Sequence, residues 1–442
     1  MTAAASGTVL AHGIGGRSDL PLPFEYAVVG AGLALVVSFL ALGLLWPSPR
    51  IDGGTAGRPL PAPLARFAGS AVPRWLLGGF GLALSALTLL AAFGGPDDTR
   101  NALPFVVYVL VWVGLVPASL LLGPSTWANL SPWRTLHEIA CRAVRLDPTE
   151  GVRPLPARLG WWPAAAGLTA FVWMELVAPW GTDVGALRLV VVAYAAVQLL
   201  AGFVYGSRWF DGGDLLQVWS HLFGRMSPFG RRDDGTAVVR SPLAGLDQLR
   251  PVPGLTATVV VMLGSTAFDS VREHPAFVGW AQSGPVPRVP ASTLAMAAVL
   301  AVVGLAFWAA SALAGRLGQG RSRGVPSAFA PSLVPIAIGY VVAHYYSFAV
   351  VEGQNAVIRL SDPLGTGAGL AGRAADATLI APGTVATVQL AAIVTGHVLG
   401  VVLAHDRAVR LFPRGRAVAG QLPLLVLMVG YTVGGLLLLF AS

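Results

Sequence analysis

Ten runs of about 20 mostly apolar residues recur along this chain of 442 residues, and they constrain its fold more than any other feature. A helix of that length spans the hydrocarbon core of a bilayer, so each run is a candidate transmembrane helix. Only 11% of the residues are charged and the mean hydropathy is +0.69, whereas soluble domains carry roughly 25% charged residues. The sequence therefore predicts an all-α, polytopic membrane helix bundle. Its expected spans are 26–46, 75–95, 104–122, 161–179, 188–206, 253–270, 291–315, 327–350, 383–404 and 420–441.

Arginine is unevenly distributed among the connecting loops. All 29 basic side chains are arginines, and most lie in alternate loops. Since loops rich in basic residues stay in the cytoplasm, both termini are expected outside, in a multi-pass protein of the cell membrane. The net charge of +8 would suggest nucleic acid for a soluble domain, but arginines at membrane interfaces argue against that partner. The arginine-rich loops lie within residues 50–74, 134–158, 208–250, 316–323 and 407–416.

The predicted topology divides the chain into two membrane halves of five helices each. An outer segment, 1–25, precedes the first half, 26–206; a basic cytoplasmic loop, 207–252, separates it from the second half, 253–442. Halves of opposite topology are typical of inverted-repeat transporters. Two amphipathic helices are expected on the cytoplasmic side, after Ser131 and after Asp214. They lie either in the headgroup layer or packed on the bundle. The outer loop 355–382 is a candidate lid.

Four ionisable residues fall inside the predicted spans: Glu175, Asp269, His344 and His397. Each costs about 2.5–3.5 kcal/mol or more if it faces lipid at the bilayer centre, so all four are expected to face the bundle interior. The topology places Glu175, Asp269 and His344 in the outer half of the membrane, with His397 beneath them. Gly396 and Gly400 form a GxxxG pattern beside His397 that permits close helix contact.

These residue types allow three kinds of site. Histidine and carboxylate ligands suit a divalent metal such as zinc, for which the candidate ligands are His344, His397 and Asp269. The alternatives are hydrogen bonding between helices and a proton or ion pathway. As a catalytic set, Glu175, Asp269, His344 and His397 would bind a metal or act as general acid and base. Tyr345, Glu352 and Gln354 would line the approach of a small-molecule substrate or ion.

The cysteine and the remaining histidines are not expected to form a functional site. Walker A, Rossmann, HExxH and nucleophile-elbow motifs are absent from the sequence, and its one cysteine, Cys141, excludes an intramolecular disulfide. The other histidines are interpreted as solvated or interfacial; they are His12, His137, His221, His274 and His405.

Several segments are similar to a family of polytopic bacterial membrane proteins known as fenitrothion hydrolases. They are AHGIGGRSDLPLP, SPWRTL, SRWFDGGDLL with MSPFGRRDDG, LGSTAFDS, SLVPIAIGYVVAHYYSF and GHVLGVVLAHDRAV, which are spread over most of the chain. The resemblance implies a membrane-embedded hydrolase of organophosphorus esters and assigns no catalytic residue.

Three functions therefore remain open: this hydrolase, a proton- or ion-coupled transporter or channel, and a membrane assembly or partner protein without catalysis. A continuous polar path favours transport, and a closed outer pocket favours an enzyme. Polar groups that pair only with one another favour the partner protein.

Overall fold

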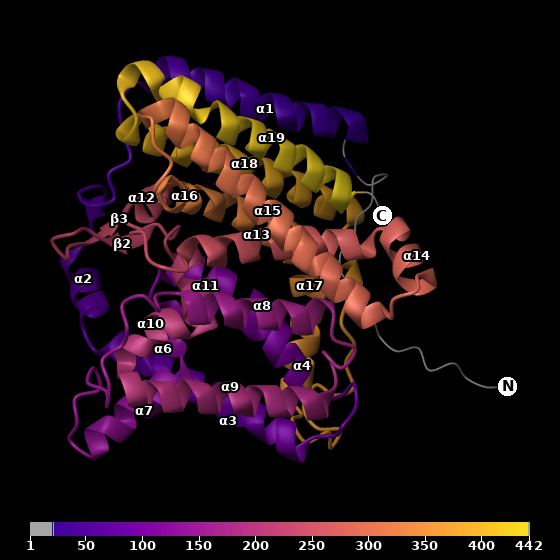
Figure 1. Cartoon of the computed structure of the whole chain (residues 1–442). Helices are drawn as coiled ribbons and strands as arrows, with labels where there is room; N and C mark the ends of the chain where they lie inside the picture. The colour runs from indigo at the N-terminus through magenta and orange to yellow at the C-terminus, as the bar shows by residue number, and fades with distance from the viewer. Residues whose placement is uncertain (1–19, 21, 441–442) are drawn as a thin grey trace.

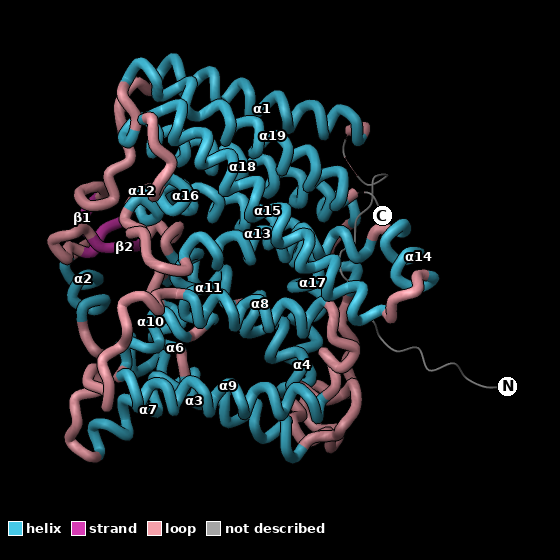
Figure 2. Tube along the Cα trace, in the orientation of Figure 1, coloured by secondary structure: helices cyan, strands magenta, loops and turns pink. Residues whose placement is uncertain are grey.

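The computed structural model describes residue 20 and residues 22–440, whose regular structure is almost entirely helical (Figures 1 and 2). Helices cover all ten segments predicted to span the membrane. Within the described residues, eight helices or helical runs are long and apolar enough to cross a bilayer, which confirms a multi-pass, all-α membrane protein. They are α1 (Phe24–Leu45), α3 (Val72–Gly94), the run Leu103–Leu122, α9 (Val184–Tyr205), α15 (Arg288–Gln319), the run Val325–Leu360, α18 (Pro382–Leu411) and the run Arg414–Leu439.

Two of the predicted spans fall outside this set. Helix α8 (Trp162–Leu176) has 15 residues, fewer than the roughly 20 that a bilayer requires. Helix α13 (Leu255–Glu273) has 19 residues but carries Asp269, Arg272 and Glu273 near its C-terminal end. The count of ten spans therefore stays a prediction, and the two exceptional helices are the ones that carry Glu175 and Asp269.

Three of the apolar runs are composite. The run Leu103–Leu122 consists of α4 (Leu103–Phe105), the π-helical segment η2 (Val106–Val113) and α5 (Leu115–Leu122). In the run Val325–Leu360, α16 (Val325–Phe329) and the 3₁₀ turn η4 (Ala330–Leu333) lead into α17 (Val334–Leu360). The last run joins the turn η6 (Arg414–Arg416) to α19 (Ala417–Leu439).

Helix α17 is the centre of the bundle. In the most apolar 18-residue stretch of the run Val325–Leu360, most of which is α17, 72% of the residues are buried, whereas none of the other seven described spans exceeds 44%. Helix α17 packs against α18 over most of its length and also contacts α13 and η2. Helices α1, α15, α18 and α19 form one group beside it, while α3 and α9 lie at the opposite edge of the bundle (Figure 1). Residues on α17 are therefore the ones most shielded from lipid.

Glycines allow α17 and α18 to approach closely. A Cβ atom on Gly396 would lie 2.6 Å from the carbonyl oxygen of Pro335, and one on Gly339 would lie 2.5 Å from that of Ala392. At Gly400 the corresponding distance to the carbonyl oxygen of Ser332 is 2.8 Å. These separations are too short for any side chain without movement, so the contact predicted from the GxxxG pattern is confirmed.

A small antiparallel sheet closes one end of the bundle. It contains β1 (Arg58–Pro59), β2 (Phe229–Arg231) and β3 (Ala237–Val239) in the order β1-β3-β2, with Arg58 and Phe229 both opposite Val239. Short helices α2 (Ala62–Gly69) and α12 (Pro242–Asp247) lie beside it, and α14 (Pro275–Ser283) lies at the other end of the bundle (Figure 1). Two arginine-rich loops that are far apart in the sequence therefore share one side of the protein, as the arginine pattern predicts.

The two predicted amphipathic helices have different environments. Helix α7 (Pro132–Ala143) begins at Ser131, whose hydroxyl accepts from the Arg134 N–H, and it exposes Leu136. Helix α11 (Leu215–Gly224) begins at Asp214, which accepts from the Leu216 N–H. Nearly every residue of α11 is buried against α5, α6 (Thr126–Leu130) and α8, so it packs within the bundle and not in a headgroup layer. The turn η3 (Ser207–Trp209) and α10 (Phe210–Gly213) connect α9 to it.

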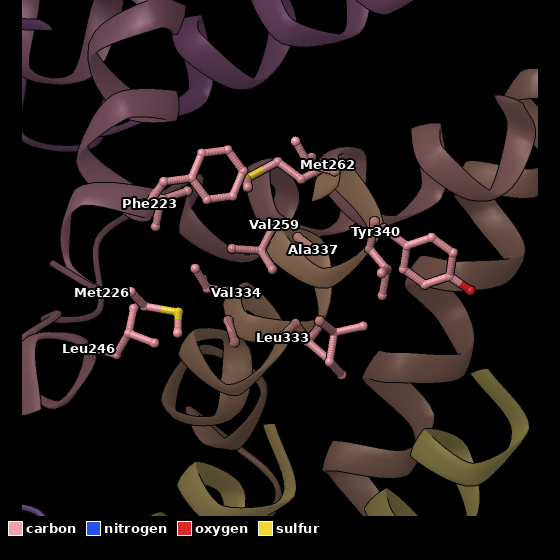
Figure 3. Packing of buried hydrophobic residues seen from close by; sticks show 14 of the residues in the cluster. Phe223, Met226, Leu246, Val259, Met262, Leu333, Val334, Ala337 and Tyr340 are labelled. Atoms are coloured by element: carbon pink, nitrogen blue, oxygen red, sulfur yellow. The ribbon is translucent and has the colours of Figure 1, made fainter. Parts of the chain in front are cut away.

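One hydrophobic cluster joins these short elements to the central helices. Figure 3 shows residues of α11 and the turn after it facing residues of α13 and α17, with the Tyr340 ring pointing away from the others. This packing sets which faces of α13 and α17 meet, and therefore how the ionisable residues further along the two helices are oriented. The labelled side chains are Phe223, Met226, Leu246, Val259, Met262, Leu333, Val334, Ala337 and Tyr340.

Helix α17 continues ten residues beyond the predicted span, to Leu360. Glu352 and Gln354 were expected at or beyond its end, but they lie on the helix itself. The Gln354 side chain donates to the Asp376 carbonyl oxygen (3.1 Å) and accepts from the Asp376 N–H (3.0 Å). The loop before α18, which includes the turn η5 (Ala377–Leu379), is thus tied to α17.

Candidate functional site

The structure brings together three of the four predicted intramembrane residues. Asp269 of α13 lies against His344 of α17, with 2.5 Å between Asp269 Oδ2 and His344 Nε2. The next residue on α17, Tyr345, donates its hydroxyl to Glu175 Oε1 of α8 at 3.0 Å. Three helices that are distant in sequence therefore contribute to one polar group within the bundle.

Arg272, which was not among the predicted site residues, completes this group. Its Nε donates to Asp269 Oδ1 at 3.0 Å, and its Nη1 donates to the Leu176 carbonyl oxygen at the end of α8, at 3.1 Å. The i, i+3 spacing of Asp269 and Arg272 on a helix was the available signal. The five residues Glu175, Asp269, Arg272, His344 and Tyr345 are called the Asp269 cluster below.

The ionised side chains of the Asp269 cluster do not balance one another in charge. Only 3% of the Asp269 side chain and 8% of the His344 side chain is exposed. Burying a net charge in an apolar bundle is costly, so such groups are paired or protonated. The five residues of the cluster include two carboxyl groups and one guanidinium, and this guanidinium also pairs at 3.6 Å with Glu273, which is 37% exposed and lies outside the cluster. As a set, the five residues are electrically neutral when they hold one proton, on His344 or on a carboxyl group. Proton binding is thus part of how this cluster is stabilised in the bundle.

A small pocket adjoins His344. Its volume of about 20 Å³ is enough for about one water molecule. Ser270, Glu273 and His274 from the end of α13 contribute polar groups, and Leu438 and Leu439 of α19 close it. Drug-sized ligands occupy pockets of about 300–1,000 Å³, so this pocket fits water and not an organophosphorus ester.

His397 lies on another interface, away from the Asp269 cluster. It is fully buried, its Nδ1–H donates to the Ile393 carbonyl oxygen (2.9 Å), and its Nε2 has no hydrogen-bond partner among the described residues. The ring lies edge-on to Tyr340, with 6.2 Å between the ring centroids. Tyr340 lies one helical turn before His344 on α17, so its ring is placed between the level of His344 and His397.

A third polar group lies near the sheet end of α18. His405 was interpreted as solvated or interfacial, but it is buried among packed helices, and only 1% of it is exposed. Its two ring nitrogens face the Gln421 side-chain oxygen (3.1 Å) and the Trp46 carbonyl oxygen (2.9 Å). The adjacent Asp406 accepts from the Trp46 indole and two backbone N–H groups and pairs with Arg410 at 3.4 Å.

Of the other histidines, His137 differs from expectation, His274 does not, and one lies outside the described residues. His137 is buried, with its Nε2 3.1 Å from the Pro148 carbonyl oxygen, so it is not solvated. His274 caps α14 and accepts from the Ala276 N–H. His12 falls in the part of the chain that the structure does not describe.

The proposed metal ligands and approach residues are dispersed. Among the described residues, no three His, Cys, Asp or Glu side chains are grouped so as to hold a metal ion. His344 and Asp269 engage each other, while His397 lies beside Tyr340. Glu352 accepts from the Asn355 side chain at 2.9 Å. Tyr345 is 7% exposed and donates a hydrogen bond to Glu175, so it belongs to the Asp269 cluster.

Fold and site together define the class: a multi-pass helical membrane protein with a buried acid–base cluster. No family model, curated protein or solved structure matches the chain.

Proposed function

We propose that this chain translocates protons across the cell membrane, as a channel or as part of a proton-coupled transport cycle. The charge count of the Asp269 cluster carries the proposal, because the cluster is neutral only with one proton bound. In the proposed orientation the sheet end faces the cytoplasm and both termini face outward, since the arginine-rich loops gather at the sheet end. The Asp269 cluster then lies in the outer half of the bundle.

Polar groups continue from that cluster toward the sheet end. Tyr340 lies one turn before His344, which is about 6 Å along α17, and its ring contacts His397. His405 follows His397 by eight residues on α18, about 12 Å further. A proton passes in this proposal from Asp269 and His344 to the unpartnered His397 Nε2, and from there to His405 and Asp406. The longest interval, between the two histidines of α18, requires water or a helix movement.

A hydrolase of organophosphorus esters is the second candidate. Its support is the resemblance together with the Asp269–His344 contact, because a carboxylate that orients a histidine is a common general-base arrangement. It requires α13 and α17 to separate, since the pocket beside His344 holds about one water. Transport requires no cavity of substrate size for the proton itself, and it therefore fits the observed geometry better.

Proton flux into vesicles tests the proposal. The purified protein is reconstituted in liposomes that contain a pH-sensitive dye, and a potassium gradient with valinomycin imposes the membrane potential. The variant Asp269→Asn removes a proton-binding carboxyl group with little change in volume. The matched control is Asp98→Asn, because Asp98 forms an exposed pair with Arg100 outside the bundle.

The expected result is flux above that of protein-free vesicles for the wild type and the Asp98→Asn control, and loss of that flux in Asp269→Asn. Wild-type vesicles no leakier than empty ones, or an Asp269→Asn variant that conducts normally, would overturn the proposal. Turnover of a nitrophenyl phosphotriester that is lost in Asp269→Asn, without flux, would support the hydrolase instead. A wild type that shows neither activity would leave a membrane assembly or partner protein as the remaining class.

A further inference from the structure

A second polar cavity lies at the sheet end, far from the Asp269 cluster. It has a volume of about 480 Å³ and lies where the end of α11, strand β2 and the segment before α13 meet. Four arginines line it: Arg225, Arg231, Arg232 and Arg250. Asp233 is the only acidic residue in its wall, so the lining carries an excess of positive charge. We call this cavity the arginine pocket.

The arginine pocket is a built structure and not a chance meeting of surface side chains. Arg225 Nη1 and the buried Arg240 Nη1 both donate to the Gln248 side-chain oxygen, at 3.3 Å and 2.7 Å. The Gln248 amide in turn donates to the Arg231 carbonyl oxygen (3.0 Å) and to Asp233 Oδ1 (3.1 Å). The Gln248 side chain thus links the segments that form the walls of the pocket.

His221 fixes the orientation of Arg225 without adding charge. The Arg225 Nε donates to His221 Nε2 at 3.1 Å. Burial and the nearby Arg225 lower the pKa of His221 to about 3, so the imidazole is neutral and accepts this bond. The Arg225 guanidinium is therefore held at the pocket wall by two acceptors that bear no negative charge.

The positive charge in the arginine pocket is not balanced by its lining, in which four arginines accompany one aspartate. Burial, and secondarily the adjacent Arg240, lowers the pKa of Arg225. Arg232 Nε is buried and has no hydrogen-bond partner among the described residues. Like charges around one cavity repel one another, and an anion with several oxygens would remove that repulsion and supply the missing acceptors.

We propose that the arginine pocket binds a phosphate-bearing anion, either the headgroup of an anionic phospholipid or a soluble phosphorylated molecule. Arginine forks match phosphate oxygens in geometry, and the cavity volume lies within the range of small-molecule sites. A single carboxylate would leave most of the four guanidinium groups unbalanced. The lining includes Trp161, whose backbone N–H donates to the Pro253 carbonyl oxygen (2.7 Å), and Val252, so the pocket adjoins the segment that leads into α13, the helix that carries Asp269.

The two sources of phosphate are separated by two binding measurements. Inorganic pyrophosphate is titrated calorimetrically into the full-length protein in phosphatidylcholine nanodiscs. Native mass spectrometry then counts phosphatidylglycerol molecules retained by the protein from mixed micelles. The test variant is Arg231→Gln/Arg250→Gln, since both side chains are exposed at the pocket rim. The control is Arg153→Gln/Arg158→Gln, which removes the same charge from exposed positions outside the pocket.

We expect one of the two probes to bind the wild type and the control, and to bind the rim variant about tenfold or more weakly, because hydrogen bonds to charged groups are strong. Saturable pyrophosphate binding assigns a soluble ligand, and selective phosphatidylglycerol retention assigns a lipid. Equal loss in the control, or no binding of either probe to the wild type, overturns the proposal. Arg250→Gln alone is the reserve variant if the double variant unfolds, because Arg250 makes no side-chain hydrogen bond within the described residues. The proton-flux result does not enter this test, so either proposal can fail alone.

Discussion

The contact between α17 and α18 predicts opposite behaviour for two glycine-to-alanine substitutions. A Cβ atom on Gly396 would lie 2.6 Å from the Pro335 carbonyl oxygen and 3.2 Å from the Gly339 Cα. On Gly434 of α19 the same atom would meet nothing within 4 Å. Both glycines lie inside apolar helices. Gly434→Ala is therefore a matched control for Gly396→Ala.

The size of the effect follows from the overlap. Carbon–oxygen contacts between helices settle at about 3.3–3.6 Å, so a methyl group on Gly396 forces the helices apart by about 0.7–1 Å. Overpacking of this kind costs about 1–3 kcal/mol. Alanine also gains about 1 kcal/mol of helix propensity over glycine, but this gain is common to both variants and cancels in the comparison. Gly396→Ala is thus expected to be about 1–3 kcal/mol less stable than Gly434→Ala.

Tryptophan fluorescence during unfolding in mixed detergent micelles measures this difference, because the chain contains 13 tryptophans. Equal stability of the two variants would refute the close approach of α17 and α18. The Gly339→Ala/Gly396→Ala double variant should lose less than the sum of the single losses, because both methyl groups push the same helices apart. The same separation would move Tyr340 from His397, so reduced proton flux is expected in Gly396→Ala.

Two further predictions concern hydrogen bonds. Tyr345→Phe removes the hydrogen-bond donor to Glu175 and should lower the free energy of unfolding by about 1–3 kcal/mol. The control Tyr346→Phe should change it by no more than about 0.5 kcal/mol. Similar unfolding curves for the two variants would contradict this role of Tyr345. The pKa of His221 is about 3 in the folded protein and about 6.5 in the unfolded chain. Between these values only the unfolded chain binds the proton, so the stability of the protein falls as the pH drops from 6.5 toward 3. His221→Gln, which keeps an acceptor for Arg225, should flatten this part of the melting-temperature profile.

The positions of the helices were largely predictable, because the length of an apolar run is itself the physical requirement for spanning a bilayer. The proximity of three ionisable residues was predictable as well. Once the arginine loops set the direction of each span, Glu175, Asp269 and His344 fell in the same half of the membrane, and the structure places them in one cluster. The direction of each span and the position of each residue along it were enough for that result.

Rotation about each helix axis was not predictable. Neither Arg272 bonding back to the end of α8 nor His397 facing Tyr340 follows from depth, because both depend on which face of a helix meets its neighbour. Burial of His137 and His405 was missed for a related reason. Their polar atoms are satisfied by backbone carbonyls or side chains from distant segments, such as the Trp46 carbonyl oxygen for His405, and one sequence does not show those partners.

The two helices that are poorest as membrane spans explain why a polar cluster can exist in this bundle. Helix α8 ends at Leu176, directly after Glu175, and the last turn of α13 carries Asp269, Arg272 and Glu273. Both helices thus end beside the cluster, so Arg272 can bond the free carbonyl of Leu176, one of the unpaired groups that every helix end leaves. Longer apolar helices would place lipid-like side chains at that level and leave His344 of the central helix without partners. The shortness of α8 and the polarity of the end of α13 are therefore conditions for the buried acid–base pair, and their extension with apolar residues should abolish it.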